Sequence, residues 1–400
     1  MRNTSTKPDL RFPEFNDEWD FKYGNEIFDT ISNKNHNSDL QILAISQEFG
    51  AIPRHLINYD IAVTEKSIST YKIVDIGDFI ISLRSFQGGI EYSNYKGICS
   101  PAYIILRPKI NIENQFFKYY LKTYNYIQNL QMRLEGIRDG KMISFKYFSE
   151  VKLPLPNKKE QKRIADFLIT IDKRIEQLKE KKELLEQYKK GITQKIFSQE
   201  LRFKDEEGKD FPDWTFLKLK DVFAIKSIKN KNSLIQNVLT NSATRGIVSQ
   251  GDYFDKDIAN QNNLEGYYVV EIDDFVYNPR ISQSAPVGPL KRNNLAIGVM
   301  SPLYTILTCK KGNLDFFENY FNSNFWHKYM KGIANYGVRH DRMNITKDGF
   351  EKLPLPFPEV KEQEKIAAFL NEIDKQIQAV TSQLKQSKKF KKGLLQKMFV

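Results

Sequence analysis

VKLPLPNKKEQKRIADFLITIDKRIEQL (residues 151–178) recurs in the second half of the chain as EKLPLPFPEVKEQEKIAAFLNEIDKQIQAV (residues 351–380). The match continues in GITQKIF (residues 191–197) and GLLQKMF (residues 393–399). Because the period is about half the chain, the sequence indicates one duplicated unit and excludes a solenoid of many short repeats.

Fainter matches precede both blocks in the same order. They pair LRFPEFNDEWDFKYGNEIF (residues 10–28) with LRFKDEEGKDFPDWTFLKLKDVF (201–223), VDIGDFIISLR (74–84) with VEIDDFVYNPR (270–280), GICSPAYIIL (97–106) with GVMSPLYTIL (298–307), and EGIRDGKM (135–142) with YGVRHDRM (336–343). Trp19 aligns with Trp214 and Phe28 with Phe223, and we expect all four in domain cores.

The duplication predicts a globular domain followed by a helical block, twice over. The expected boundaries are a first domain at residues 1–156, a central helical spacer at 157–199, a second domain at 200–356 and a C-terminal helical spacer at 357–400.

Each domain is predicted to be α+β. LQILAIS (40–46), YKIVDIGDFIISL (71–83) and SPAYIILRP (100–108) are rich in β-branched and aromatic residues, which favours short strands. FFKYYLKTYNYIQNLQMRL (116–134) has aromatic and leucine residues at three- and four-residue spacing, which predicts a helix. The second domain repeats this pattern in DFFENYFNSNFWHKYMKGI (315–333).

A long helix is predicted after each LPLP segment, in which alternate prolines enforce an extended backbone. Asn157 followed by Glu160 predicts a capping box at the start of the first helix. Pro358 is predicted at the first position of the second helix. Gly191 and Gly393 each either end or kink their helix, and the sequence leaves both alternatives open.

The apolar residues of both helices keep a heptad spacing, which predicts helices that pack along their length. The seam consists of Ile164, Leu168, Ile171, Ile175, Leu178, Leu185, Ile192 and Ile196 in the first helix, and of Ile366, Leu370, Ile373, Ile377, Val380, Leu384, Leu394 and Met398 in the second. Lys182, Lys189, Ser387 and Lys391 interrupt the seam, which lowers its expected stability and leaves room for a protein partner.

A helix of about 35 residues spans roughly 50 Å, too long to pack against one small domain. The order domain, helix, domain, helix allows the two helices to lie antiparallel as a coiled coil, with the domains at opposite ends in a pseudo-two-fold arrangement. The alternative is an ordinary coiled-coil dimerisation tail. The duplication within one chain favours the internal pair.

A formal net charge of +12 favours a polyanionic partner, either nucleic acid or a membrane surface. The opening MRNTSTKPDLRF has no apolar signal core, and no window approaches the apolar length of a membrane span, so we expect a soluble, cytoplasmic protein. Cys99 and Cys309 lie far from any CxxC pattern or histidine pair, which argues against a zinc site.

The sequence resembles the specificity subunits of type I restriction-modification systems over essentially its whole length. The LPLP…EQ…IA.FL..ID blocks, the QK(I/M)F helix ends and the LRF…W…F segments carry the resemblance. It implies two target-recognition domains that each read one half of a bipartite site in double-stranded DNA, and helices that set the distance between the halves. No membrane association is expected.

The resemblance also implies partners and cofactors. Two modification subunits, which bind S-adenosylmethionine, would dock on the helical spacers and methylate adenines. Restriction subunits with translocase and nuclease activity would use ATP with Mg. No cofactor is expected in this chain itself.

The chain lacks the usual motifs of catalysis. It has no Gly-x-x-x-x-Gly-Lys-Ser/Thr phosphate loop and no Gly-x-Ser-x-Gly elbow. NPRI (278–281) comes nearest to the Asn-Pro-Pro-aromatic tetrad of adenine methyltransferases, but it lacks the second proline and the aromatic residue, so we expect a strand end. The histidines, His36, His55, His327 and His340, show no metal-ligand spacing. A non-catalytic chain is therefore expected.

Candidate DNA-binding residues lie on two loops per half, because base and phosphate contacts need exposed Arg, Lys, Asn, Gln or Ser side chains. The loop after the aligned strand supplies Arg84, Ser85 and Gln87 in the first half and Arg280, Ser282 and Gln283 in the second. A later loop supplies Arg138 and Lys141, and then Arg339, His340 and Arg342. For the first loops a solvated surface is an equal alternative, and for the aligned arginines of the later loops we expect phosphate contacts or buried ion pairs.

Candidate partner-binding residues are the apolar positions of the helical spacers. They are Ile164, Leu168, Ile171, Ile175, Leu178, Leu185, Ile366, Leu370, Ile373, Ile377, Val380 and Leu384.

Two other functions compete with DNA recognition. A stand-alone DNA methyltransferase or nuclease with an unrecognised catalytic site would bind S-adenosylmethionine or cleave DNA with a metal, without partners. A structural coiled-coil adaptor would show no sequence preference even with its partners present.

Overall fold

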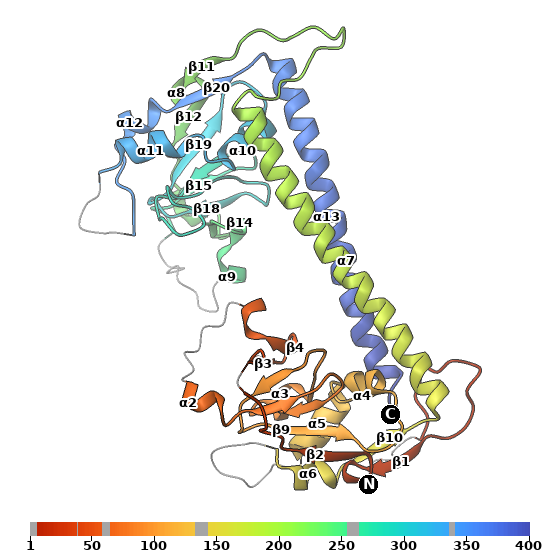
Figure 1. Cartoon of the computed structure of the whole chain (residues 1–400). Coiled ribbons are helices and arrows are strands. Elements are labelled where there is room, and N and C mark those ends of the chain that lie inside the picture. The colour runs from red at the N-terminus through yellow and green to blue at the C-terminus, as the bar shows by residue number, and fades with distance from the viewer. Residues whose placement is uncertain (1–5, 38, 58–64, 133–142, 254–263, 336–340) are drawn as a thin grey trace. The chain divides into compact units, whose positions relative to one another are not determined.

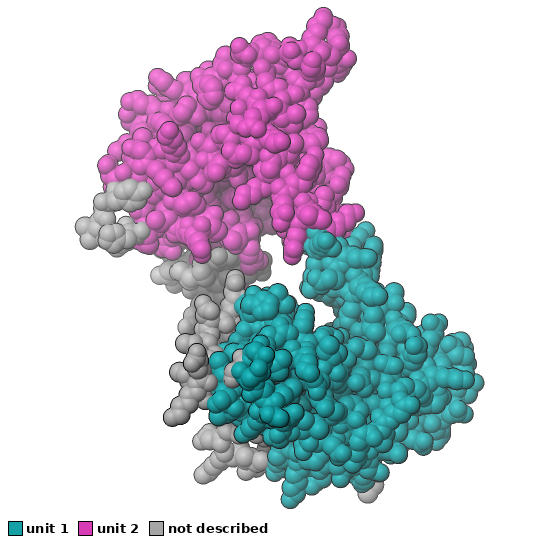
Figure 2. Space-filling view, in the orientation of Figure 1, with its two compact units in different colours: residues 1–180, 381–400 teal, residues 181–380 magenta. Residues whose placement is uncertain are grey.

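The computed structural model describes residues 6–37, 39–57, 65–132, 143–253, 264–335 and 341–400. The chain divides into two compact units, which are coloured separately in Figure 2. Unit 1 comprises residues 1–180 and 381–400, and unit 2 comprises residues 181–380. Each unit therefore combines one domain with the beginning of one long helix and the end of the other.

Unit 1 is built on a four-stranded antiparallel sheet in the order β2-β9-β6-β7. Its strands are β1 (Asp20–Tyr23), β2 (Phe28–Ile31), β3 (Leu43–Ser46), β4 (Gly50–Pro53), β5 (Lys72–Val74), β6 (Phe79–Ile81), β7 (Glu91–Tyr92), β8 (Gly97–Cys99), β9 (Ile104–Pro108) and β10 (Lys152–Leu155). Its short helices are α1 (Gly24–Ile27), η1 (Arg54–Leu56), α2 (Glu65–Ile68), α3 (Ser85–Gly88), α4 (Asn114–Tyr120), α5 (Tyr124–Met132) and α6 (Phe145–Ser149).

Unit 2 has the corresponding sheet in the order β12-β19-β16-β17. Its strands are β11 (Thr215–Lys218), β12 (Phe223–Lys226), β13 (Leu239–Ser242), β14 (Gly246–Ser249), β15 (Tyr268–Val270), β16 (Phe275–Tyr277), β17 (Leu290–Arg292), β18 (Gly298–Met300), β19 (Thr305–Cys309) and β20 (Pro354–Phe357). Its short helices are α8 (Leu219–Val222), η2 (Lys231–Ser233), α9 (Gln250–Tyr253), α10 (Leu314–Phe321), α11 (His327–Ile333) and α12 (Lys347–Glu351).

The same strand pairs recur in both units. The pairs β1-β10, β3-β4 and β5-β8 of unit 1 correspond to β11-β20, β13-β14 and β15-β18 of unit 2. The predicted mixture of helix and sheet is confirmed, and the sequence duplication corresponds to a repeated topology.

Aromatic side chains fill both cores, as the paired Trp and Phe residues predict. Trp19 and Trp214 are 3% and 8% exposed, and Phe28 and Phe223 are fully buried. Phe28 packs edge-on against Phe79 with ring centroids 5.2 Å apart, a favourable arrangement for aromatic rings.

The LPLP segments are extended, as predicted. Pro154 in β10 lies opposite Phe21 in β1, and Pro356 in β20 lies opposite Phe216 in β11. Each pair is a two-stranded sheet, so the prolines cost few hydrogen bonds there. The chain thus begins and ends each domain on adjacent strands, directly before a long helix.

The two long helices are α7 (Lys158–Phe197) and α13 (Val360–Lys397), drawn in Figure 1. The Asn157 Oδ1 atom accepts from the Glu160 backbone N–H at 2.9 Å, which confirms half of the predicted capping box. The Glu160 carboxylate binds Arg11 instead of completing the box. The predicted place of Pro358 is wrong, because α13 begins two residues later.

Both glycines lie inside their helices. α7 continues past Gly191 to Phe197, and α13 continues past Gly393 to Lys397. Neither glycine therefore ends its helix. Tertiary packing beyond each glycine explains this, because Ile196 and Met398 are almost fully buried.

The single helix predicted at residues 116–134 is wrong, because α4 and α5 are separate elements. The Thr123 hydroxyl donates to the Tyr120 carbonyl at 2.8 Å and accepts from the Tyr126 N–H at 3.3 Å, so it starts a new helix. In unit 2, Ser323 lies at the corresponding break between α10 and α11.

Among the described residues, no helix has the length and apolarity that crossing a membrane requires.

Candidate nucleic-acid interface

The loop after β16 leaves a strand end that is held by a buried asparagine. Asn278 donates through Nδ2 to the Asn241 carbonyl at 3.1 Å and accepts through Oδ1 from the Arg280 N–H at 3.0 Å. Arg280, Ser282 and Gln283 follow and are all exposed. NPRI therefore lies at a strand end, as predicted, and the exposed side chains of Arg280, Ser282 and Gln283 begin within it and follow it.

A tight turn fixes the rest of this loop. Ser282 and Ala285 exchange two backbone hydrogen bonds of 3.0 and 3.1 Å. Gly288 has φ +79°, and a Cβ atom there would lie 2.1 Å from the Asn278 carbonyl oxygen, so only glycine fits. The exposed side chains are consequently held on a defined backbone.

The two candidate loops of unit 2 meet. Arg280 and Arg342 form an antiparallel bridge, flanked by hydrogen bonds from the Ile281 N–H to the Asp341 carbonyl (3.0 Å) and from the Met343 N–H to the Pro279 carbonyl (2.9 Å). Two loops far apart in sequence thus present their arginines side by side. Arg339 and His340 lie outside the described residues.

The Arg342 guanidinium is half-buried, with the Asp341 carboxylate 3.8 Å from its Nε atom. That Nε atom is buried and has no hydrogen-bond partner among the described residues.

The corresponding loop of unit 1 follows β6. Arg84 and Gln87 are exposed, and the Arg84 carbonyl accepts from the Gln47 side chain at 2.7 Å. Ser85 is 1% exposed, and its hydroxyl accepts from the Ser82 N–H at 2.8 Å, so it supports the turn and does not face solvent. Arg138 and Lys141 lie outside the described residues.

Unit 1 also has a glycine of positive φ before the last strand of its sheet, Gly89. Its φ is +82°, and a Cβ atom would lie 2.1 Å from the Leu121 carbonyl oxygen. The two domains therefore hold loops of different sequence at one position of one topology. Arginine pairs geometrically with guanine, glutamine pairs with adenine, and serine contacts any base, so such loops suit two different base sequences.

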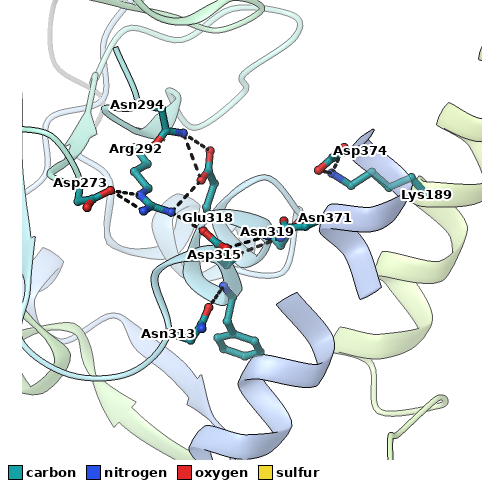
Figure 3. Close-up of polar contacts among 11 residues, drawn as sticks. Lys189, Asp273, Arg292, Asn294, Asn313, Asp315, Glu318, Asn319, Asn371 and Asp374 are labelled. Atoms are coloured by element: carbon teal, nitrogen blue, oxygen red, sulfur yellow. Dashed lines mark hydrogen bonds and ion pairs between the residues drawn. The ribbon is translucent and has the colours of Figure 1, made fainter. Parts of the chain in front are cut away.

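Ion pairs join α7 and α13 inside each unit. In unit 1, Asp172 binds Lys391 at 2.5 Å. In unit 2, Asp374 binds Lys189 at 2.6 Å, as Figure 3 shows. Both lysines were expected to weaken the helix seam, but the structure gives each a carboxylate on the other helix.

Most apolar heptad residues are buried within the chain. Ile164 and Leu168 share a core cluster with Leu394 in unit 1, and Ile366 and Leu370 share one with Ile196 in unit 2. Buried seam residues are Ile164, Leu168, Ile175, Leu178, Ile366, Leu370, Ile373 and Val380, and half-buried ones are Ile171, Leu185, Ile377 and Leu384. Direct contact with a partner protein therefore stays a prediction for the half-buried positions, while the buried ones support the helices.

Within the part of the chain that the structure describes, no three His, Cys, Asp or Glu residues are placed to hold a metal. Burial raises the pKa of the Cys99 thiol to about 12, which disfavours the thiolate that metal binding requires.

A family model for the type I restriction modification DNA specificity domain matches residues 16–187 and 212–387. The chain belongs to this family.

Curated relatives of this specificity-domain chain occur in Methanocaldococcus jannaschii. The putative type I restriction enzyme MjaX specificity subunit is 25% identical over 353 residues, which are 83% of this chain and 80% of the relative. The type I restriction enzyme MjaVIII specificity subunit is 31% identical over 175 residues, which are 42% of this chain and 40% of the relative.

Solved structures of the specificity-subunit fold match nearly the whole chain. The HsdS subunit from Thermoanaerobacter tengcongensis has a TM-score of 0.51 and 16% identity, covering 98% of this chain and 99% of that one. The S subunit of a type I restriction-modification system from M. genitalium has a TM-score of 0.54 and 15% identity, with the same coverage. At such identities the likeness concerns the fold.

The duplicated Glu-Gln step at the start of α7 and α13 has a role that the sequence did not predict, since only Glu160 was assigned one, in a capping box. The Arg11 guanidinium binds Glu160 at 2.7 Å, and that of Arg202 binds Glu362 at 2.8 Å. Both carboxylates are at most 1% exposed. The hydrogen bond to Glu362 raises the pKa of the Arg202 guanidinium.

The adjacent glutamines attach each domain to its helix. Gln161 accepts from the Glu113 N–H at 2.9 Å and donates to the Pro156 carbonyl at 2.7 Å. Gln363 does the same with Asn313 and Pro358, at 2.8 Å in both bonds. The repetition of these two polar residues after each LPLP segment was the available signal.

Proposed function

We propose that this chain is the DNA sequence-reading subunit of a type I restriction-modification system, in which each domain reads one half of a bipartite site. One observation carries the proposal. Both domains present exposed polar side chains in the loop at the same topological position, after β6 and after β16, and the two loops differ in length and conformation, with α3 in unit 1 and a tight turn in unit 2. A protein that reads two unlike half-sites requires this combination of a common topology and variable contacts.

The helices would act as the spacer between the half-sites, as one antiparallel coiled coil with pseudo-two-fold symmetry. The ion pairs support this arrangement. From Asp172 to Lys189 the first helix advances by as many residues as the second helix runs back from Lys391 to Asp374. Both ion pairs therefore fit a single uninterrupted antiparallel register. On this basis the domains would occupy residues 1–156 and 200–356, and the spacers residues 157–199 and 357–400.

The solvent-facing sides of the spacers would dock two modification subunits, which bring S-adenosylmethionine, and restriction subunits would add ATP with Mg. This chain would contribute no cofactor and no catalytic group. The basic net charge of +12 suits the shared task of holding DNA.

The test is to co-express the chain with its neighbouring modification subunit and to map methylated adenines genome-wide by long-read sequencing. We expect one two-part motif with a fixed unspecified gap, which disappears when the gene for this chain is deleted. Unchanged methylation despite a stable complex would support a scaffold without DNA specificity and would contradict the proposal.

The purified chain also tests the alternative hypothesis that the protein is itself an enzyme. A stand-alone methyltransferase or nuclease would bind S-adenosylmethionine or cleave DNA with a metal as the purified chain alone. We expect neither activity without the modification subunit.

A further inference from the structure

Among the differences between the two central sheets is a charged position on β7 and β17. Glu91 lies opposite Ile80 in the β6-β7 ladder, and Lys291 lies opposite Val276 in the corresponding β16-β17 ladder. In unit 1 the buried Glu91 carboxylate forms an ion pair with Lys122. In unit 2, Lys291 has replaced the acid.

Lys291 has no carboxylate partner among the described residues. Its Nζ atom donates to the Oδ1 atom of Asn322, the residue that aligns with Lys122. The neighbouring Glu318 carboxylate is turned to Asn294 and Arg292, as Figure 3 shows. Burial lowers the pKa of the Lys291 ammonium, which is half-removed from water. A cation in this state gains from an added counter-charge.

A second difference opens a cavity beside this lysine. In unit 1 the Tyr119 hydroxyl donates to Asp172 at 2.8 Å and so links the domain to α7. The aligned residue in unit 2 is Asn319, whose side chain donates to the Asp315 carbonyl at 2.9 Å and does not reach Asp374. A cavity of about 470 Å³ lies there, lined by both helices and by the domain.

The cavity wall carries an excess of positive charge. Its two acids are already paired, Glu186 with Lys182 at 2.8 Å and Asp374 with Lys189 at 2.6 Å. Burial, and then the charge of Lys331, lowers the pKa of the His327 imidazole, which favours the neutral form of this wall residue. Lys291 is thus a cation inside a space large enough for a side chain.

We propose that this cavity receives the carboxylate of an aspartate or glutamate from the modification subunit docked on unit 2, with Lys291 as its ionic partner. The inference rests on the proposed function. Charge complementarity favours a single protein carboxylate over the polyanionic backbone of DNA, because the three lysines of the wall, Lys189, Lys190 and Lys291, exceed its two acids by only one charge. The occupied Tyr119 site of unit 1 makes the two docking sites unequal.

The test uses the double variant Lys291→Glu/Asn322→Lys, which places in unit 2 the same acid and base that unit 1 holds as Glu91 and Lys122. The control Lys231→Gln changes the net charge by the same amount at an exposed residue. The full-length chain is titrated with modification subunits, and bound copies are counted by native mass spectrometry. We expect the wild type and the control to bind two copies, and the double variant to bind the second copy about thirtyfold more weakly.

Equal affinity of the double variant and the wild type for both copies would overturn this inference and leave the proposed function standing. Unchanged subunit binding with weaker DNA binding would assign the cavity to a phosphate and overturn it too. A wild-type chain that binds no modification subunit would overturn the proposed function and this inference with it.

A second measurement does not depend on the fold of the variant. Carbodiimide treatment of the wild-type complex joins a carboxylate to an amine as an amide, while the reagent takes up the water released. Peptide mass spectrometry should find an amide between the Lys291 Nζ atom and an acidic residue of the modification subunit. Its absence, with other lysine cross-links between the two proteins present, would overturn the proposal.

Discussion

A buried carboxylate with one guanidinium partner stands at the start of each long helix. Replacing Arg202 with Leu leaves Glu362, which is fully buried, with the Trp214 indole N–H at 3.0 Å as its one remaining side-chain donor among the described residues. We expect a loss of about 2 to 3 kcal/mol in the free energy of unfolding, because an uncompensated buried charge is strongly destabilising. Urea denaturation measures it.

Lys352→Leu is the matched control, because Lys352 forms an exposed pair with Asp348. Exposed ion pairs contribute little to stability, so its denaturation midpoint should stay near that of the wild type. Equal shifts in both variants would mean that the Arg202–Glu362 pair contributes no more than a surface pair.

Arg280 is the exposed arginine of the bridge between the two loops of unit 2. Arg280→Ala should weaken DNA binding by the assembled complex by about 1 to 3 kcal/mol. If Arg280 contacts a phosphate, the slope of log affinity against log salt should fall by about one, and if it contacts a base, one position of the motif should relax. Fluorescence anisotropy across salt concentrations measures both.

The exposed Lys209 lies on another loop of the same unit, so Lys209→Ala serves as the control for loss of one positive charge. If Arg280→Ala and Lys209→Ala have the same DNA affinity, salt slope and recognised motif, Arg280 does not contact DNA.

At the scale of elements, the last helix ends inside the core of unit 1. Phe399 is 4% exposed, and its ring lies 5.2 Å from that of Phe116. Phe399→Ala should destabilise unit 1 by about 3 to 4 kcal/mol, since it removes a buried ring. Phe390→Ala, on the same helix at a residue 56% exposed, should have little effect. Thermal unfolding of both variants checks this, and equal stability would contradict the assigned packing.

The elements differ in how far the sequence predicts them. The heptad spacing of apolar residues was enough to predict α7 and α13, because a long amphipathic helix shows its periodicity in the local sequence. The sequence did not predict the break between α4 and α5 at Thr123, because the apolar pattern continues through this residue. The hydrogen bond of the Thr123 hydroxyl, which causes the break, leaves no mark on that pattern. Pro358 was misplaced because it precedes the helix, where its carbonyl accepts from Gln363.

The candidate DNA-binding loops were also predicted only in part from the sequence. Their position after an aligned strand was predictable, because the duplication marks it. Ser85 could not be recognised as buried, since only the fold shows that its hydroxyl holds the Ser82 N–H. The meeting of Arg280 with Arg342 likewise depends on a long-range strand bridge that leaves no local pattern.

For the whole molecule, the proposed spacer predicts that the length of the helices sets the gap between the two half-sites. Deleting residues 179–185 and 378–384 together removes one heptad from each helix and keeps the register of both ion pairs. The spacer should shorten by about 10 Å, and the gap in the methylated motif by about three base pairs, with unchanged half-sites. Long-read methylation mapping measures the gap.

Deleting residues 179–185 alone breaks the register and should abolish methylation. An assembled double deletion that keeps the original gap would show that the helices do not set the spacing.

The position of Phe399 also governs the order in which the protein can be completed during synthesis. The first domain leaves the ribosome before unit 2 is made, yet part of its core comes from Leu394, Met398 and Phe399. At 5 to 20 residues per second, residues 181–380 take roughly 10 to 40 s to translate. During that interval Phe116 and Tyr120 lack the Phe399 ring that covers them, so the core of unit 1 is completed only after unit 2 has been synthesised.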